Sequence, residues 1–311
     1  MRYRIVWLGT TDFSKGPLLQ VIEDGHEVVA VCSALGNSPT VEVAKEQGIP
    51  VHVVRDVKDP EFALRLMGYQ ADLFVVCAFP ILPEEVISIP RLGCIGIHPS
   101  RLPEFRGAAP IEAFLQSGNE STGVTTFLIS KGVDNGDILK QETWRFDKVN
   151  DMFPVVRDVL ESGARELISV TLQDFGAVMP IPQSDFKYTP GKAPKITKES
   201  RRVRFKLQDT KDVIGKMRAF FDNGGIWTTL TGTSTEVIIH EGYFDLMDTC
   251  RIQGCHVDQL YYDNSKRYFF IPFGRDDSIV LVPRKIQTAG RKVMGVKDWR
   301  NGIKMNEVRF D

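Results

Sequence analysis

The sequence predicts an α/β protein: an open, mostly parallel sheet flanked by helices, followed by a smaller, β-rich and barrel-like domain. Short apolar runs of strand character alternate with amphipathic helical segments through the first half of the chain. One of these runs, residues 71–79, is apolar almost throughout, as strands covered on both faces of a parallel sheet are. The last third has short strand-like runs separated by turn residues, which is typical of a small barrel or sandwich.

Each element of the first half has a local signal. The opening run, residues 3–9, ends at a Gly-Thr turn, and this favours a first strand over a signal peptide. The segment 38–49 has Ser38 as an N-cap and Gly48 as a stop, which predicts a helix. We expect strands at 3–9, 27–34, 51–54, 71–79 and 93–100, and helices at 15–26, 38–49, 59–70 and 82–90.

The pattern continues through the middle of the chain and then changes. A Pro- and Gly-rich stretch, Pro180 to Lys195, is the best linker candidate. We therefore expect a first domain at 1–180, a linker at 181–200 and a second domain at 201–311. Before the linker we expect helices at 107–119 and 151–176 and strands at 121–130 and 135–146; after it, a helix at 210–221 and strands at 225–232, 235–244, 267–273 and 278–287.

The composition is that of a soluble globular protein. The chain has 311 residues, of which 42% are hydrophobic and 25% charged, with a net charge of −1. Because no apolar run approaches the length of a membrane span, we expect no membrane partner. Five widely spaced cysteines favour reduced thiols and a cytoplasmic protein. Cys250 and Cys255 beside His256 lack a second ligand pair, so we predict no metal site.

Charge is distributed unevenly along the chain. Residues 195–311 carry 21 Lys and Arg against 15 Asp and Glu, so the rest of the chain is acidic. A modestly basic tail is compatible with a nucleic-acid partner and, equally, with an ordinary solvated surface.

Three polar or turn-rich stretches each follow a predicted strand, at 78–85, 98–107 and 130–137. Ligands of open α/β sheets bind beyond the carboxyl ends of the strands, so we expect these stretches to converge on one site. The chain has no G-x-G-x-x-G, G-x-x-x-x-G-K-[ST] or H-E-x-x-H pattern, which argues against a dinucleotide site, a P-loop and a zinc protease.

His98 ends one of these strands, and Asp134 lies in a Gly-bounded loop after the next. A carboxylate beside a histidine orients the ring and favours its protonated form. Such a pair suits proton transfer and oxyanion stabilisation in acyl transfer. A lone histidine is more often structural, however, and Asp is common in turns, so from position alone both interpretations stay open.

Several segments resemble the formyltransferases that use 10-formyltetrahydrofolate. Residues 98–111, HPSRLPEFRGAAPI, are similar to the family signature H-x-S-L-L-P-x-x-R-G-A-x-P-I, and residues 132–139, GVDNGDIL, to its G-L-D-T-G-D-I-L. Residues 75–87, VVCAFPILPEEVI, resemble the folate-pocket segment. Residues 193–199, APKITKE, with the β-rich tail, resemble the linker and C-terminal domain of the tRNA-specific branch.

The resemblance implies a Rossmann-like catalytic domain, an OB-like C-terminal domain and a monomeric formyl-transferring enzyme with reduced folate as donor. His98 and Asp134 match the catalytic His and Asp, and Gly96 stands where the family has a catalytic Asn. The implied folate-binding residues are Phe79, Pro80, Ile81, Leu82, Ser100, Leu102, Pro103, Lys131 and Val133; the implied acceptor-binding residues are Arg106, Gly107, Arg201, Arg202 and Arg204, with Arg291 and Lys292 as further candidates for phosphate contacts.

The glycine at position 96 departs from the family pattern. Loss of one oxyanion donor typically costs roughly 10²–10³ in rate. We expect that Gly96 has simply lost a side chain, leaving space that a water can occupy and that an Asn can refill. The alternatives are a slow transferase, a formyltetrahydrofolate hydrolase like the module of formyltetrahydrofolate dehydrogenase, and a protein that only binds folate.

The acceptor is ambiguous as well. The family's tRNA enzymes carry a long basic loop after the second strand, whereas Ser33 to Ala44 is short and has no Lys or Arg. That favours an amino sugar or another small amine. The full-length C-terminal domain and its basic stretch at 195–206 instead suit tRNA phosphates. The methionyl amine of initiator Met-tRNA is the leading expectation, and a small amine is the alternative.

Overall fold

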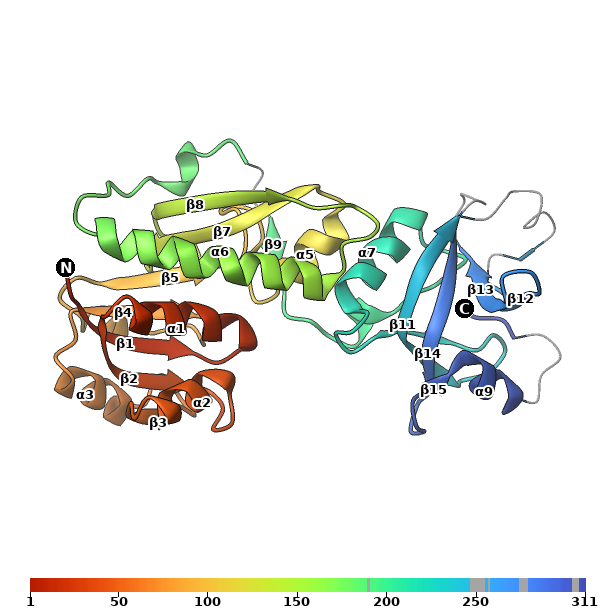
Figure 1. Cartoon of the computed structure of the whole chain (residues 1–311), viewed down its shortest axis with the longest axis horizontal. Coiled ribbons are helices and arrows are strands. Elements are labelled where there is room, and N and C mark those ends of the chain that lie inside the picture. Colours follow the sequence, from red (N-terminus) through yellow and green to blue (C-terminus); the bar gives the residue numbers. More distant parts are fainter. Residues whose placement is uncertain (189–190, 247–254, 257, 274–278, 304–307) are drawn as a thin grey trace. The chain divides into compact units, whose positions relative to one another are not determined.

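The structure is a computed structural model that describes residues 1–188, 191–246, 255–256, 258–273, 279–303 and 308–311 (Figure 1). The chain divides into two compact units. The first consists of Met1–Pro110, Ser121–Arg145 and Val156–Pro194; the second consists of Ile111–Glu120, Phe146–Val155 and Lys195–Asp311. The first unit therefore includes most of the stretch that the sequence suggested as a linker.

The first unit is built on a sheet whose described strands number seven, in the order β3-β2-β1-β4-β5-β7-β8. The strands on the β3 side pair in parallel as far as β5, and β7 and β8 join antiparallel. This confirms the open, mostly parallel sheet. The strands are β1 (Arg4–Gly9), β2 (Glu27–Ser33), β3 (Val51–Val53), β4 (Leu73–Cys77), β5 (Cys94–His98), β7 (Ser121–Leu128) and β8 (Ile138–Arg145).

Helices cover this sheet (Figure 1). They are α1 (Lys15–Glu23), α2 (Pro39–Glu46), α3 (Pro60–Gly68), α4 (Glu84–Ile87) and the long α6 (Phe153–Asp174). Ser38 caps α2 as predicted, because its side chain accepts a hydrogen bond from the Val41 N–H and Pro39 begins the helix. Helices α1 and α6 lie side by side, and the Gly16 N–H donates to the Glu161 carboxylate at 3.1 Å.

Strand β4 lies at the centre of the sheet, and every residue of it is buried. This explains why residues 71–79 read as continuously apolar rather than alternating. The central position also sends the loop after β4 to the same edge as the loop after β5, because Val76 pairs with Gly96 and Cys77 with Ile97.

The second unit carries an antiparallel sheet in the order β10-β11-β14-β13-β12, with β15 against β14. Its strands are β10 (Ile226–Thr229), β11 (Glu236–Leu246), β12 (Tyr261–Asp263), β13 (Tyr268–Pro272), β14 (Ile279–Thr288) and β15 (Met294–Gly295), and its helices are α5 (Pro110–Ser117, from Ile111 onward), α7 (Thr210–Phe220) and α9 (Val296–Asn301). Sequence reasoning missed β12, β15 and α9, whose patterns are too short to show a period.

A buried cation explains why α5 and residues 146–155 belong to the second unit. Arg218 of α7 is 1% exposed and donates to the carbonyls of Asp147, Asp151 and Leu115. Burial lowers the pKa of this guanidinium. The three carbonyls satisfy it, as a buried charge requires.

Two sequence expectations concern metals and membranes. Within the described ranges, His, Cys, Asp and Glu form no group of three or more that could hold a metal ion. Cys250 of the Cys250, Cys255 and His256 set lies outside the described residues. Among the helices described, none combines the length and the apolar character needed to cross a membrane.

Candidate active site

The loops after β4, β5 and β7 meet in the first unit, although not for the reason expected. Strand β7 runs antiparallel to β5, so its carboxyl end, Leu128, lies beside Ile95 rather than beside His98. The loop 130–137 returns along the sheet and brings Asp134 to His98. The first and third loops also meet, since Lys131 lies 3.8 Å from the Glu84 carboxylate.

His98 is held by its own loop and faces Asp134. Its Nε2 lies 2.9 Å from the Phe105 carbonyl oxygen, which can only accept, so Nε2 carries the proton of the neutral ring. Nδ1 then points to Asp134, whose Oδ2 is 3.7 Å away. That oxygen also accepts a hydrogen bond from the Gly107 N–H at 2.9 Å. The His98 side chain is 7% exposed and that of Asp134 is 25% exposed, so His98 is buried and Asp134 lies between it and the solvent-exposed surface.

Each of the three loops contains a non-glycine residue in the left-handed backbone region. These residues are Ala78 with φ 53°, Phe105 with φ 54° and Asp134 with φ 47°. Such conformations are uncommon outside glycine and persist where the surrounding structure imposes them. In these conformations the Phe105 carbonyl faces His98, and the Asp134 carboxylate accepts from the Gly107 N–H.

The expectation that Gly96 leaves free space is wrong. A Cβ on Gly96 would lie 2.4 Å from Cε1 and 2.5 Å from Cζ of Phe127. Phe127 is the cross-strand partner of Gly96 and is 4% exposed. It packs with Leu102 and Ile138. The aromatic ring therefore occupies the place beside Gly96, and neither a water nor an Asn side chain fits there while the ring stays where it is.

The residues expected to bind folate fall into an exposed and a buried set. Ile81 and Val133 are 67% and 47% exposed. Pro80 and Lys131 are exposed as well, and Phe79 is half-buried. The buried members, whose side chains pack beneath the loops, are Leu82, Ser100, Leu102 and Pro103.

Sequence reasoning missed the residues that hold the His98 loop. Thr125, directly opposite His98 on β7, donates to the Ser100 carbonyl at 2.7 Å and accepts from the Leu102 N–H. Gln141 of β8 donates to the Leu102 carbonyl and to Thr125. Both side chains look like ordinary strand residues, and only the cross-strand register reveals their role.

Arg106 and Gly107 form the short strand β6 (Arg106–Gly107), which pairs with β9 (Lys192–Ala193). Gly107 has φ 129°, and a Cβ there would lie 2.4 Å from the Ala193 carbonyl oxygen, so this position accepts only glycine. The Arg106 guanidinium is engaged by Gln183, whose Oε1 accepts from Nε at 2.9 Å and from Nη2 at 2.5 Å.

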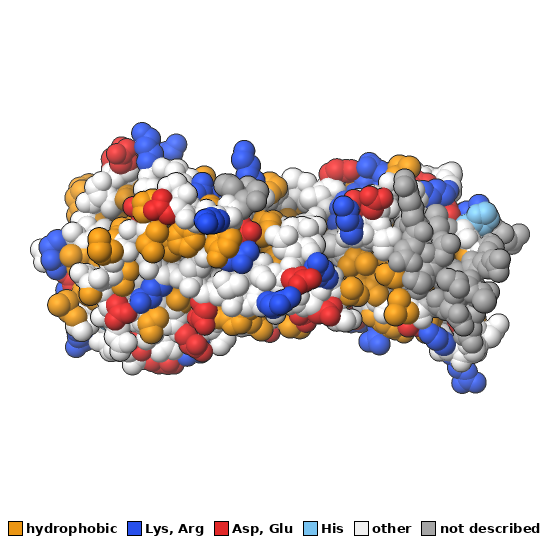
Figure 2. All heavy atoms as spheres, turned by 90° about the horizontal axis from the view of Figure 1, so that it is seen from above, with side chains coloured by type: hydrophobic (Ala, Val, Ile, Leu, Met, Phe, Trp, Pro, Cys, Tyr) orange, Lys and Arg blue, Asp and Glu red, His pale blue; other side chains and the backbone are white. Residues whose placement is uncertain are grey.

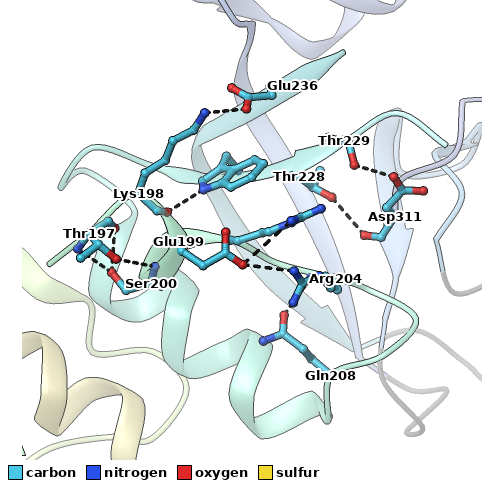
Figure 3. Close-up of polar contacts among 12 residues, drawn as sticks. Thr197, Lys198, Glu199, Ser200, Arg204, Gln208, Thr228, Thr229, Glu236 and Asp311 are labelled. Carbon is cyan, nitrogen blue, oxygen red and sulfur yellow. Dashed lines mark hydrogen bonds and ion pairs between the residues drawn. The ribbon is translucent and has the colours of Figure 1, made fainter. Parts of the chain in front are cut away.

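The expected acceptor-binding arginines of the second unit have partners within that unit. Arg201 donates to the Gly224 carbonyl, and Arg202 stacks on Trp227 at 4.8 Å. Arg204 donates to Glu199 at 3.1 Å, as Figure 3 shows. Arg291 and Lys292 are exposed. On the face seen in Figure 2, basic and acidic side chains are interspersed.

Cysteine nucleophiles are excluded near the strand ends. Burial raises the pKa of the Cys32 and Cys94 thiols to about 12 and raises that of Cys77 as well. These thiols stay protonated at neutral pH, so they are not nucleophiles. The titratable pair that faces the site is His98 and Asp134.

Comparison with known proteins identifies the family. The formyl transferase family model matches residues 3–171. A methionyl-tRNA formyltransferase from Parabacteroides distasonis is 30% identical over 97% of this chain and 96% of its own length. Another, from Caldanaerobacter subterraneus, is 36% identical over 65% of this chain and 69% of its length.

Solved structures share the fold at low identity. HypX from Aquifex aeolicus, in complex with tetrahydrofolic acid, aligns with a TM-score of 0.66 at 19% identity over 100% of this chain and 51% of that one. An N-formyltransferase from Helicobacter canadensis, in complex with folinic acid and dTDP-3-aminofucose, aligns with a TM-score of 0.65 at 14% identity over 93% of this chain. The family match and the full-length relative together show that the chain belongs to the formyl transferase family and is an enzyme that transfers one-carbon formyl groups.

Proposed function

We propose that this enzyme transfers a formyl group from 10-formyltetrahydrofolate to the methionyl amine of initiator Met-tRNA, with His98 and Asp134 as its catalytic residues. The observation that carries the proposal is the facing pair itself, with 3.7 Å between Nδ1 and Oδ2, on loops that match the formyltransferase signatures. Full-length relatives named methionyl-tRNA formyltransferase support the acceptor.

The two residues have separate tasks in this proposal, and the geometry of the pair supports them. The His98 Nδ1 carries the lone pair, so it accepts the proton that the acceptor amine loses as its nitrogen bonds to the formyl carbon. The same proton then goes to the folate nitrogen as the bond to that nitrogen breaks. Asp134 stabilises the imidazolium between these events, and the Gly107 N–H keeps its carboxylate in place.

We propose that the donor binds at the loops described above. The pterin of reduced folate has apolar faces and polar edges, which suits apolar side chains beside backbone hydrogen-bonding groups. Ile81 and Val133 provide the apolar contacts, and the backbone near Pro80, Leu82 and Val133 provides hydrogen bonds. We propose that the first unit forms the whole folate-binding and catalytic domain.

A small amine is the second candidate acceptor, favoured by one observation. Residues 33–40 are tied down by a hydroxyl chain: Ser33 to Ser38 at 2.7 Å, Ser38 to Thr40 at 3.0 Å, and Thr40 to the Gly9 carbonyl at 2.8 Å. This compact segment has no Lys or Arg to reach a nucleic acid. The Helicobacter canadensis N-formyltransferase, solved with an amino sugar nucleotide, shares the fold.

The deciding experiment supplies 10-formyltetrahydrofolate with either charged initiator tRNA or an amino-sugar nucleotide, and follows acceptor mass and formate release. We expect the added formyl mass on the methionyl amine. Formylation of the amino-sugar nucleotide alone would contradict Met-tRNA as the acceptor and support a small amine. Formate release with both acceptors unchanged would contradict transfer and indicate a hydrolase.

A further inference from the structure

Residues 181–188 and 191–193, which follow α6, tie the two catalytic loops together. Ile181 exchanges two backbone hydrogen bonds with Ile138, directly after the Asp134 loop. Strand β9 pairs with β6, and the Ala193 carbonyl accepts from the Ala108 N–H at 2.7 Å, beside the His98 loop. One segment therefore contacts both the loop that carries Asp134 and the strand that follows the His98 loop.

Gln183 is the side chain at the centre of this segment. It is 5% exposed, and its amide makes every hydrogen bond open to it. Nε2 donates to the Asp134 carbonyl at 2.9 Å and to the Gly136 carbonyl at 2.8 Å. Oε1 accepts two hydrogen bonds from Arg106. The amide thus bridges the loop that carries Asp134 and the strand that carries Arg106.

We propose that Gln183 is a positioning residue that sets the distance between Asp134 and His98; this inference rests on the proposed function. The Asp134 backbone is in the left-handed region, which Asp adopts more readily than most residues and which neighbouring contacts hold in place. Gln183 holds its carbonyl from one side, while the Gly107 N–H, next to Arg106, holds its carboxylate from the other. Nε2 of Gln183 thus contacts the Asp134 carbonyl directly, and Oε1 holds Arg106, whose neighbour Gly107 binds the Asp134 carboxylate.

The amide's two ends have separable tasks, which allows a sharp test. Gln183→Glu keeps acceptors for Arg106 but loses both N–H donors and brings a carboxylate against two carbonyl oxygens. Gln183→Met keeps the length and loses both ends. If Gln183 served only to anchor Arg106, the Glu variant would behave as wild type. Under our proposal it is as impaired as the Met variant.

The first readout needs no activity. Amide hydrogen exchange is measured on the full chain, with Ser184→Ala in the same turn as control. We expect exchange at Gly107 and in residues 130–137 to rise about tenfold in both Gln183 variants and to stay unchanged in the control. Unchanged exchange in the two variants would overturn the proposal, whether or not the enzyme transfers formyl groups.

The second readout is a double-mutant cycle in formyl transfer. We expect Gln183→Glu to lower kcat about 10²-fold with little change in the affinity for a folate analogue. In the Asp134→Asn background the same change should cost less than about threefold, because its effect passes through Asp134. Equal losses in both backgrounds would overturn the positioning role. A wild-type chain with no transfer to any amine, but with faster exchange in the variants, would overturn the proposed function and leave the positioning contact supported.

Discussion

The close contact between Gly96 and Phe127 predicts how much stability a side chain at position 96 costs. Gly96→Ala adds one methyl group, which would lie 2.4 Å from the Phe127 Cε1. Carbon atoms settle at about 3.5–4.0 Å, so the ring must move by about 1 Å or more. The ring is 4% exposed and packed against Leu102 and Ile138, and overpacking of this kind costs about 1–3 kcal/mol. Gly96→Asn adds a further ~1–3 kcal/mol if its amide finds no partner.

Phe127→Leu is the compensating change, because leucine has no atoms in place of Cε1 and Cζ. We expect the free energy of unfolding of Gly96→Ala/Phe127→Leu to exceed the additive value by about 1–2 kcal/mol, within the usual range for residues in contact. Urea denaturation of the full chain measures all four proteins. Gly68→Ala, at the end of α3, is a control without a clash, since a Cβ there meets nothing within 4 Å, and it should be neutral or slightly stabilising.

A Gly96→Ala protein as stable as wild type would refute this reasoning, because it would mean that the ring yields at no cost. The pair also bears on catalysis. Gly96→Asn alone should be no faster than wild type, because Phe127 blocks the place of its amide. Gly96→Asn/Phe127→Leu should turn over about tenfold faster than Phe127→Leu alone if the amide reaches the formyl oxygen.

Three further predictions concern folate, tRNA and pH. Ile81→Ala and Val133→Ala should each weaken a 10-formylfolate analogue about tenfold in calorimetry, because each loses apolar area buried by the ligand; unchanged affinity would place folate elsewhere. Affinity for tRNA should fall steeply between low and physiological salt, and Arg291→Ala should reduce the slope of log affinity against log salt by about one. An affinity that does not change with salt would exclude phosphate contacts. Hydrogen bonds from the Arg4 backbone N–H and from the Arg91 guanidinium lower the pKa of Asp72. Its contribution to stability is thus complete above its ordinary pKa and is lost as pH falls through the lowered value, and Asp72→Asn should flatten the acid side of the stability curve.

The main sheet was predictable because its signals are local. Strand β4 is buried on both faces, and its sequence is apolar throughout. Ser38 is an N-cap residue directly before α2, so the start of that helix was predictable as well. The proximity of His98 and Asp134 was also predicted, although the chain reaches Asp134 by a different route from the one expected. An antiparallel β7 sends Asp134 back along the sheet, and the direction of a strand leaves no mark in its own residues.

The supporting side chains could not be predicted, because they depend on register and on distant contacts. Phe127 reads as one apolar residue of a strand, and only its pairing with Gly96 shows that it fills the neighbouring space. Gln183 lies in a Pro-rich stretch that resembles a linker, and its partners are 47 to 77 residues away. A Pro-rich composition marks an irregular backbone, but it does not show whether that backbone packs against a domain.

The most direct test of the catalytic pair measures the rate of formyl transfer from 10-formyltetrahydrofolate in wild type, His98→Ala, Asp134→Asn and the double variant, by the mass of the formylated acceptor. Because the two residues act as a unit, we predict that each single change lowers kcat by about 10²–10⁴ and that the double variant is scarcely slower than either. Losses that add in the double variant, or a His98→Ala enzyme with wild-type turnover, would contradict the account.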